Sequence, residues 1–195
     1  MSVSRETAER LELFVALLLE ENERQNLISR STTSEVWTRH IEDSLQLLDH
    51  APSHAHWLDI GSGPGLPGLV LAIAGVNHIT LVEPRRLRTD FLERCREQLG
   101  LQGVTVITGK AEQLKGCFDV ITARAVAPLR KLFALGEPLL APGGQWVLPK
   151  GRSAEKELVE ASATWQGEFR LEPSRTDPDA RILVAHGVRR RTGRG

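Results

Sequence analysis

The chain has 195 residues, a length that favours one domain with enough chain to bury a sizeable core. Hydrophobic residues make up 41% and charged residues 26%, which is the composition of a folded protein and excludes a disordered one. Lys and Arg together number 25, as do Asp and Glu, so net charge announces no nucleic-acid partner; binding to one requires a local basic patch.

The N-terminal residues and the cysteines narrow the cellular setting. Residues 1–10 are polar and carry both charges, which is not typical of a secretory signal, and the apolar run 13–19 is too short to span a bilayer. Cys95 and Cys117 lack the spacing of metal ligands. We therefore expect a cytoplasmic protein with no membrane segment and no metal.

Residues 1–52 predict a helical extension packed on the main domain. A first helix is expected over 5–25, with an apolar stripe of Leu11, Phe14 and Leu18. A second is expected to begin near Thr32, whose spacing to Glu35 is that of a capping box, and to end before Pro52. Its buried face would carry Trp37, Ile41, Leu45 and Leu48.

Residues 53–188 alternate between short apolar runs and amphipathic stretches. Strands are expected at 56–60, 78–82, 103–107, 118–122, 145–149, 168–172 and 181–186. Helices fall between most of them. One has a stripe of Leu87, Phe91, Cys95 and Leu99, and a later one has a stripe of Ala154, Leu158, Ala161 and Trp165. This order predicts an α/β fold with a mostly parallel, seven-stranded sheet and helices on both faces. The basic segment 189–195 is expected to be a disordered tail.

The stretch 58-LDIGSGPGLPG-68 has two interpretations. Gly63, Gly65 and Gly68 read as G-x-G-x-x-G, and Glu83 follows at about the spacing of a dinucleotide fingerprint, which favours an NAD-linked oxidoreductase. Two prolines inside the loop, however, remove N–H donors that a pyrophosphate would need. The loop therefore favours a ligand with adenosine but no phosphate, such as S-adenosylmethionine. Glu83 would accept hydrogen bonds from the ribose hydroxyls of this ligand.

Several separated segments carry a family resemblance. The order of strands and loops over residues 56–188 is similar to class I S-adenosylmethionine-dependent methyltransferases, which have a Rossmann-like fold. The segments 61-GSGPGLPG-68, 39-RHIEDSL-45, 122-TARAVAPL-129 and 150-KG-151 together resemble the glucose-inhibited division protein B family. The members of that family are bacterial methyltransferases that modify a guanine at N7 in small-subunit (16S) ribosomal RNA.

The resemblance implies S-adenosylmethionine as cofactor and a set of residues that contact it. These are Gly61, Gly63, Leu66, Glu83, Ala111, Glu112 and Arg124. Two positions depart from the family pattern: Glu83 stands where many members have Asp, and Ala123 stands where the family has Ser before the arginine. The second departure removes any role for a serine hydroxyl.

The reaction that the resemblance implies fits the absence of an obvious catalytic pair in the sequence. Guanine N7 carries an available lone pair, so no general base is needed, and we name no catalytic acid or base. Small-subunit ribosomal RNA, or the small subunit itself, is the expected partner of a protein that needs to be no more than a monomer. The candidate phosphate contacts are Arg39, Arg85, Arg86 and Lys150, within a wider patch that adds Arg30, Arg88 and Arg152.

The residues alone leave three alternatives open. One is a methyltransferase with a small-molecule or protein acceptor. The second is the NAD-linked oxidoreductase, for which little chain remains to form a substrate domain. The third is a catalytically silent module that binds RNA.

Overall fold

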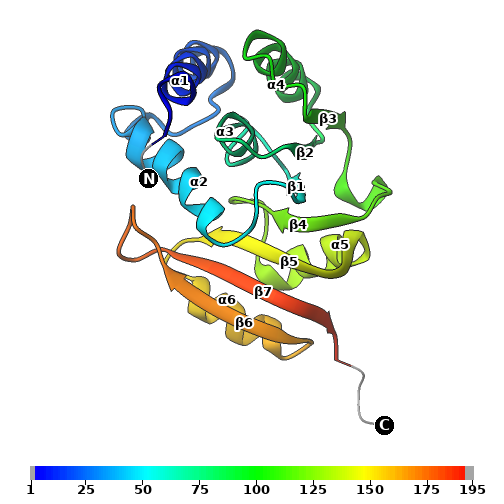
Figure 1. Ribbon diagram of the computed structural model, residues 1–195. Helices are drawn as coiled ribbons and strands as arrows, with labels where there is room; N and C mark the ends of the chain where they lie inside the picture. Colours follow the sequence, from blue (N-terminus) through cyan, green and yellow to red (C-terminus); the bar gives the residue numbers. More distant parts are fainter. Residues whose placement is uncertain (1–2, 192–195) are drawn as a thin grey trace.

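The computed structural model describes residues 3–191, which form a seven-stranded sheet flanked by helices (Figure 1). The order of strands across the sheet is β3-β2-β1-β4-β5-β7-β6. The strands are β1 (His56–Ile60), β2 (His78–Glu83), β3 (Val104–Thr108), β4 (Phe118–Thr122), β5 (Leu140–Lys150), β6 (Trp165–Pro173) and β7 (Arg181–Arg190).

The first five strands pair in parallel, and β7 runs antiparallel between β5 and β6. The predicted α/β fold with a mostly parallel sheet is therefore confirmed. From β1 the chain builds the sheet outward through β2 and β3, then crosses back to place β4 on the other side of β1, so the strand order reverses between β1 and β4. Ligands of such sheets bind beyond the carboxyl ends of the strands at this switch point.

Helices cover both faces because successive strand residues point to opposite sides. Trp57 and Ile79 pack in one apolar cluster with α1, α3 and α4, whereas Leu58 and Val82 pack in another with α5 and α6. Figure 1 shows these two groups of helices on opposite sides of the sheet. The helices are α1 (Arg5–Gln25), α2 (Asp43–Leu45), α3 (Gly68–Ile73), α4 (Arg86–Gln98), α5 (Leu129–Gly136) and α6 (Ala154–Ser162).

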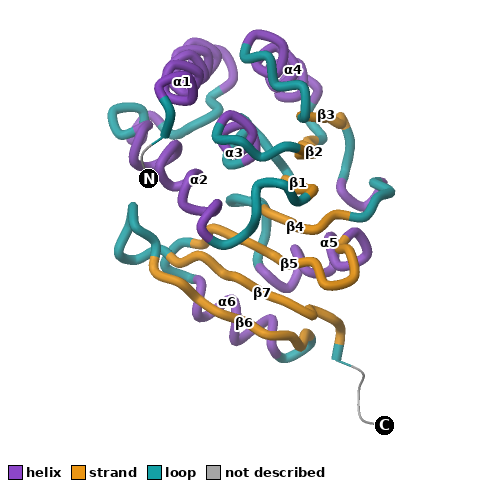
Figure 2. Tube along the Cα trace, viewed as in Figure 1, coloured by secondary structure: helices purple, strands orange, loops and turns teal. Residues whose placement is uncertain are grey.

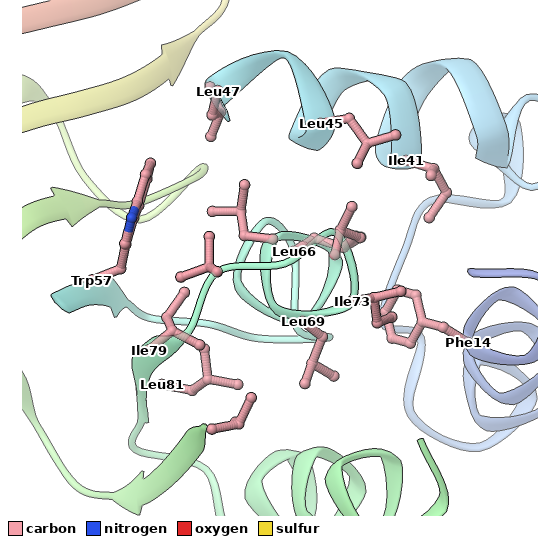
Figure 3. Close-up of a cluster of buried hydrophobic side chains, with 14 of the residues drawn as sticks. Phe14, Ile41, Leu45, Leu47, Trp57, Leu66, Leu69, Ile73, Ile79 and Leu81 are labelled. Atoms are coloured by element: carbon pink, nitrogen blue, oxygen red, sulfur yellow. The ribbon is translucent and has the colours of Figure 1, made fainter. Parts of the chain in front are cut away.

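The N-terminal helices share the core of the sheet and are not a separate unit. Phe14 from α1, together with Ile41 and Leu45, surrounds the short helix α3, while Trp57 and Leu81 approach α3 from the sheet (Figure 3). The α1 helix spans the predicted residues 5–25, begins at the cap Ser4 and ends at Asn26 in a left-handed conformation. Short helical turns occur at η1 (Arg30–Thr32), η4 (Ala111–Gln113) and η5 (Glu137–Leu139).

The second N-terminal helix differs from the prediction. Thr32 ends the turn η1, and its hydroxyl donates to the carbonyl of Ser29, so no capping box forms. The segment continues as the π-helix η2 (Trp37–Glu42), then α2, then the 3₁₀ turn η3 (Gln46–Asp49). A π-helix has a wider turn than 3.6 residues, which breaks the predicted stripe. Ile41 is buried, but Trp37 is 40% exposed, so its predicted core position is wrong.

Three further expectations are corrected by the structure. Leu87 lies in the first turn of α4 and is 69% exposed, because the buried stripe begins one turn later with Phe91 and Cys95. Trp165, expected on a helix, begins β6. The predicted disordered tail is wrong for its first residues: β7 runs to Arg190, and the next backbone N–H donates to the Thr164 carbonyl. Residues 192–195 lie outside the described chain.

Loops from distant parts of the sequence meet at the carboxyl ends of the parallel strands. Figure 2 shows the loop between β6 and β7 on the same side of the molecule as α2. Hydrogen bonds join the two: the Thr176 hydroxyl donates to Asp43 at 2.9 Å. The ends of β4 and β5 lie beside them, because Arg124 and Lys150 line the same cavity as Asp43. This edge of the sheet is where we place the candidate site.

Candidate functional site

The loop between β1 and α3 requires its glycines. Gly61, Gly63 and Gly65 have φ angles of +69°, +53° and +86°, a region that L side chains rarely adopt. Space is also short: a Cβ on Gly61 would lie 2.6 Å from Cγ2 of Val126, and one on Gly65 would lie 2.4 Å from Cδ1 of Leu69. The loop is thus packed between the segment after β4 and the helix that follows it.

The loop satisfies its own backbone donors. The N–H groups of Gly61 and Ser62 donate to the carbonyl of Val82 at the end of β2, and those of Gly65 and Leu66 donate to the Ser62 carbonyl. The prolines at 64 and 67 have no N–H to offer. No nest of free N–H groups therefore remains for a pyrophosphate, which speaks against a dinucleotide.

Two carboxylates take the remaining N–H groups of the loop. Glu83 accepts from Gly63 at 3.0 Å through Oε2 and from Arg85 at 3.0 Å through Oε1, and the Arg88 guanidinium lies 3.9 Å from Oε2. Asp59 accepts from Gly68 at 3.1 Å through Oδ2. The two N–H donors fix the Glu83 carboxylate in place. Each of its oxygens keeps a second lone pair and can still accept a hydrogen bond from a hydroxyl group.

Asp59 is a buried acid that the sequence reasoning did not single out. Its side chain is fully buried in β1, and its Oδ1 has no hydrogen-bond partner among residues 3–191. Burial raises the pKa of Asp59 to about 7, although the Gly68 N–H and the charge of Arg124 oppose this shift. The group is therefore poised between its neutral and charged forms near neutral pH.

A cavity of about 420 Å³ lies over the glycine loop. Five of the seven predicted cofactor residues line it: Gly61, Gly63, Leu66, Glu83 and Arg124. The other two, in η4, are not in this lining, since Ala111 packs into the apolar cluster beneath and Glu112 is exposed. The other lining residues were not predicted for the cofactor; among them are Leu27, Arg88 and Val126.

Arg124 is held at the end of β4 by the N-terminal segment. Its Nη1 donates to Nδ1 of His40 at 3.1 Å and to the carbonyl of Arg39 at 3.3 Å, and lies 3.6 Å from Oδ2 of Asp43. Arginine has no acceptor, so Nδ1 of His40 must be unprotonated, and Nε2 donates to the Thr32 hydroxyl at 3.0 Å. His40 and Asp43 belong to the segment 39-RHIEDSL-45, which carries the family resemblance, but neither was predicted as a site residue.

The electrostatics agree with this arrangement. Burial, followed by the charge of Arg124, lowers the pKa of His40 to about 4. His40 is therefore neutral at physiological pH and can serve as the acceptor that fixes Arg124.

A second cavity, of about 710 Å³, adjoins the first. Arg124, Ala125 and Val126 line both cavities and form the wall between them. The remaining walls come from the segment before α2, the end of β5, the start of α6 and the β6–β7 loop. The site is thus two adjoining chambers that share one arginine.

The predicted RNA contacts are in unlike environments. Arg85 and Arg86 are exposed at the start of α4, and Arg86 makes an ion pair with Asp90 at 2.9 Å. Arg39 is bound to Asp177 of the β6–β7 loop at 3.0 Å. These three arginines remain candidates for phosphate contacts.

Lys150 is not a free surface lysine. Its side chain is only 10% exposed, and Nζ lies 2.7 Å from Oε2 of Glu157 and donates to the carbonyl of Ala127 at 3.1 Å. The same Glu157 oxygen accepts from the N–H of Leu129 at 3.1 Å. These bonds tie β5 and α6 to the segment that forms the wall between the cavities.

Within residues 3–191, no group of three or more His, Cys, Asp or Glu side chains is arranged to hold a metal ion. No helix in that part of the chain is long and apolar enough to cross a membrane.

Comparisons with known proteins identify the family. Residues 7–174 match the model of the family described as rRNA small subunit methyltransferase G. A protein of that name from Zymomonas mobilis is 45% identical, with 100% of this chain and 93% of the relative covered. Another from Rhizorhabdus wittichii is 46% identical, with coverages of 99% and 91%.

Solved structures show the same fold at low sequence identity. An O-methyltransferase from Bacillus cereus is 17% identical with a TM-score of 0.59, covering 89% of this chain and 90% of that one. A methyltransferase from Aquifex aeolicus is 12% identical with a TM-score of 0.61, covering 82% and 98%. Because the family model matches residues 7–174 and the relatives cover nearly the whole chain, the chain belongs to the glucose-inhibited division protein B family, the rRNA small subunit methyltransferases G.

Proposed function

We propose that the protein transfers a methyl group from S-adenosylmethionine to N7 of a guanine in small-subunit ribosomal RNA. The observation that carries the proposal is the pair of cavities that meet at Arg124, one over the glycine loop and one facing the β6–β7 loop. Two reactants need two adjoining chambers. The names of the relatives supply the ribosomal RNA substrate.

The residues of the smaller cavity fit the cofactor. A ribose diol needs an acceptor at the end of β2, and the fixed carboxylate of Glu83 provides one. The internally bonded loop offers no pyrophosphate site but leaves room for an uncharged ribose over Gly61 and Gly63. Because the loop offers no pyrophosphate site, the NAD-linked oxidoreductase is disfavoured. Leu66 adds an apolar side chain to the lining of this cavity.

The protein's share of the chemistry is positioning. When bound, the cofactor supplies an electrophilic methyl group on a sulfonium. Guanine N7 has a lone pair and loses no proton, so the site needs no base, and holding two reactants in line is itself worth several orders of magnitude in rate. Arg124, braced by His40, donates hydrogen bonds at the boundary where charge develops on the base.

The partner and the place of action follow from the substrate. Ribosomal RNA in the small subunit puts the reaction in the cytoplasm, and the exposed arginines Arg39, Arg85 and Arg86 would hold its phosphates. The two cavities are formed by one chain, which supports action as a monomer.

The test uses methyl-labelled S-adenosylmethionine with small subunits that lack the modification. We expect label at one guanine, located by the chain cleavage that N7-methylated guanine permits. Label in protein or in a small molecule would instead support the alternative acceptors. Tight cofactor binding with no label in any fraction would support the catalytically silent module.

A matched pair of variants tests the cofactor site. Glu83→Gln keeps the side-chain shape but changes one acceptor into a donor, and we expect it to weaken cofactor binding about tenfold or more by titration. Glu112→Gln alters the exposed carboxylate outside the cavity lining and is expected to change affinity less. A larger loss with Glu112→Gln would move the adenosine end of the cofactor toward η4.

A further inference from the structure

We propose that Asp43 and Arg124 together select guanine by its O6 and N1–H edge in the larger cavity. The inference rests on the proposed function and adds to it the residues that choose the base. The inference follows from which polar side-chain atoms in this cavity have hydrogen-bond partners within the protein and which do not.

Two of the carboxylates that line the cavity are fully engaged. Glu157 accepts from Lys150 and the Leu129 N–H through Oε2, and from the Ser153 hydroxyl at 2.8 Å through Oε1. Asp177 accepts from Arg39 through Oδ2 and from the Asp179 N–H at 2.9 Å through Oδ1. These groups hold the walls of the cavity together.

Asp43 is different, because only one of its oxygens accepts hydrogen bonds. Oδ1 accepts from Nε2 of Gln46 at 2.9 Å and from the Thr176 hydroxyl at 2.9 Å. Gln46 is itself buried and accepts from the Arg175 N–H at 2.9 Å, so the carboxylate is clamped from behind. Oδ2 lies 3.6 Å from Nη1 of Arg124, which is an ion-pair distance but too long for a hydrogen bond.

Arg124 supplies the complementary free donors. Nη1 is used by His40 and by the Arg39 carbonyl, which sets the plane of the guanidinium. Nε and Nη2 make no hydrogen bond with any residue in the described part of the chain, and the side chain is 20% exposed. A guanidinium that is oriented by one nitrogen and free at the other two is pre-organised to receive a planar acceptor.

The adjacent donor and acceptor match guanine and oppose adenine. Guanine presents the O6 acceptor beside the N1–H donor, whereas adenine presents the N6 amino donor beside the N1 acceptor. An arginine beside a carboxylate therefore forms two hydrogen bonds with guanine. With adenine, the arginine donor would face the N6 amino donor and the carboxylate would face the N1 acceptor. Because O6 neighbours N7 on the base, an O6 bonded to Arg124 turns N7 toward the wall shared with the cofactor cavity.

The wild-type protein provides the first measurement. Its kcat/KM is compared on small-subunit RNA in which the target guanine is kept or replaced by 2,6-diaminopurine, which retains N7 but has the donor and acceptor of adenine at positions 6 and 1. We expect loss of at least 100-fold with the replacement, since a site built to hydrogen-bond a group rejects an analogue that lacks it. Equal kcat/KM values would overturn the inference.

The second measurement uses Asp43→Asn. The amide can turn a donor toward the base, so kcat/KM for guanine should fall about 10- to 100-fold, the size expected for a hydrogen bond to a charged group, while the preference for guanine over 2,6-diaminopurine narrows by a similar factor. Loss of rate with unchanged preference would overturn the assignment, because a loosened cavity would affect both bases alike.

The control is Asp49→Asn. Asp49 binds Arg175 at 2.6 Å and so ties down the same β6–β7 loop without facing the base. Its preference for guanine should equal that of the wild type; a narrowed preference would show that loop order, not Asp43, selects the base. Failure of the proposed function is separable, since it would appear as no methylation of the guanine RNA by the wild type.

Discussion

Lys150 has two competing interpretations, a phosphate contact from the sequence and a buried ion pair from the structure, and they predict different effects of its substitution. The sequence places it among phosphate contacts, whereas the structure pairs it with Glu157 at 2.7 Å, with side chains only 10% and 19% exposed. Burial raises the pKa of Glu157, but hydrogen bonds from Lys150 and Ser153 outweigh it and leave the pKa lowered. Lys150→Met removes one partner of this nearly buried pair and leaves the carboxylate without its cation.

The expected cost follows from that burial. Removing one member of a buried ion pair destabilises by about 3–5 kcal/mol, and because this pair is slightly exposed we expect a cost of about 3 kcal/mol. For a chain of this length, that lowers the melting temperature by about 6–12 °C. Glu157→Gln should cost a similar amount, and the double variant should cost little more than either single one, since both then lose the same interaction.

Thermal and urea unfolding of the four proteins measure the coupling. Lys156→Met is the control on the same helix, because Lys156 and Glu160 are exposed and 4.0 Å apart, so its cost should stay within about 0.5 kcal/mol. RNA binding is measured against salt in parallel. A Lys150→Met variant that keeps its melting temperature but loses about one unit of salt slope would refute the structural role and restore the phosphate contact.

Three further predictions address the loop, the histidine and the basic surface. Gly61→Ala places a Cβ at positive φ against the Val126 side chain, so cofactor affinity should fall at least tenfold by titration. Because the folded pKa of His40 is about 4, below its ordinary 6.5, its contribution to stability is present above pH 6.5 and is lost as pH falls toward 4. Urea unfolding at each pH should therefore show that the free energy of unfolding of the wild type falls by about 1–3 kcal/mol more than that of His40→Gln between pH 6.5 and pH 4. Parallel plots of unfolding free energy against pH for the two proteins would refute this. Reversing the charge of Arg85 and Arg86 should weaken RNA binding and its salt dependence; unchanged salt-dependent affinity would remove them from the interface.

The sheet could be predicted because its strands are short apolar runs separated by amphipathic stretches. All seven predicted strands exist, and β1 and β4 have the predicted bounds. The period of the pattern is local, so it can be read from one segment at a time. Trp37 shows the limit of that reading, since a π-turn changes the period within a single helix and rotates one residue of the stripe into solvent.

The site was predictable only where the chain itself brings its parts together. Gly61 and Gly63 follow β1, and Glu83 ends the neighbouring strand β2, so topology alone places them at one edge of the sheet. The bond between Arg124 and His40 joins residues 84 positions apart, and no periodicity or spacing records such a pairing. The unused oxygen of Asp43 is harder still to predict, because it depends on which neighbours take the other one.

The glycine motif itself shows why the letters G-x-G-x-x-G leave the ligand open. A dinucleotide site and this site both need glycines for positive φ and close packing, so the glycines carry no information about phosphate. The ligand class is set by where the loop's N–H groups point. Here Asp59 takes the N–H at the start of α3, Glu83 takes that of Gly63, and Pro64 and Pro67 have none. No free donor for a phosphate remains when three features combine: an acid in the strand before the loop, prolines within the loop and an acid at the end of the next strand. That combination distinguishes this site from a dinucleotide site, whereas the glycines do not.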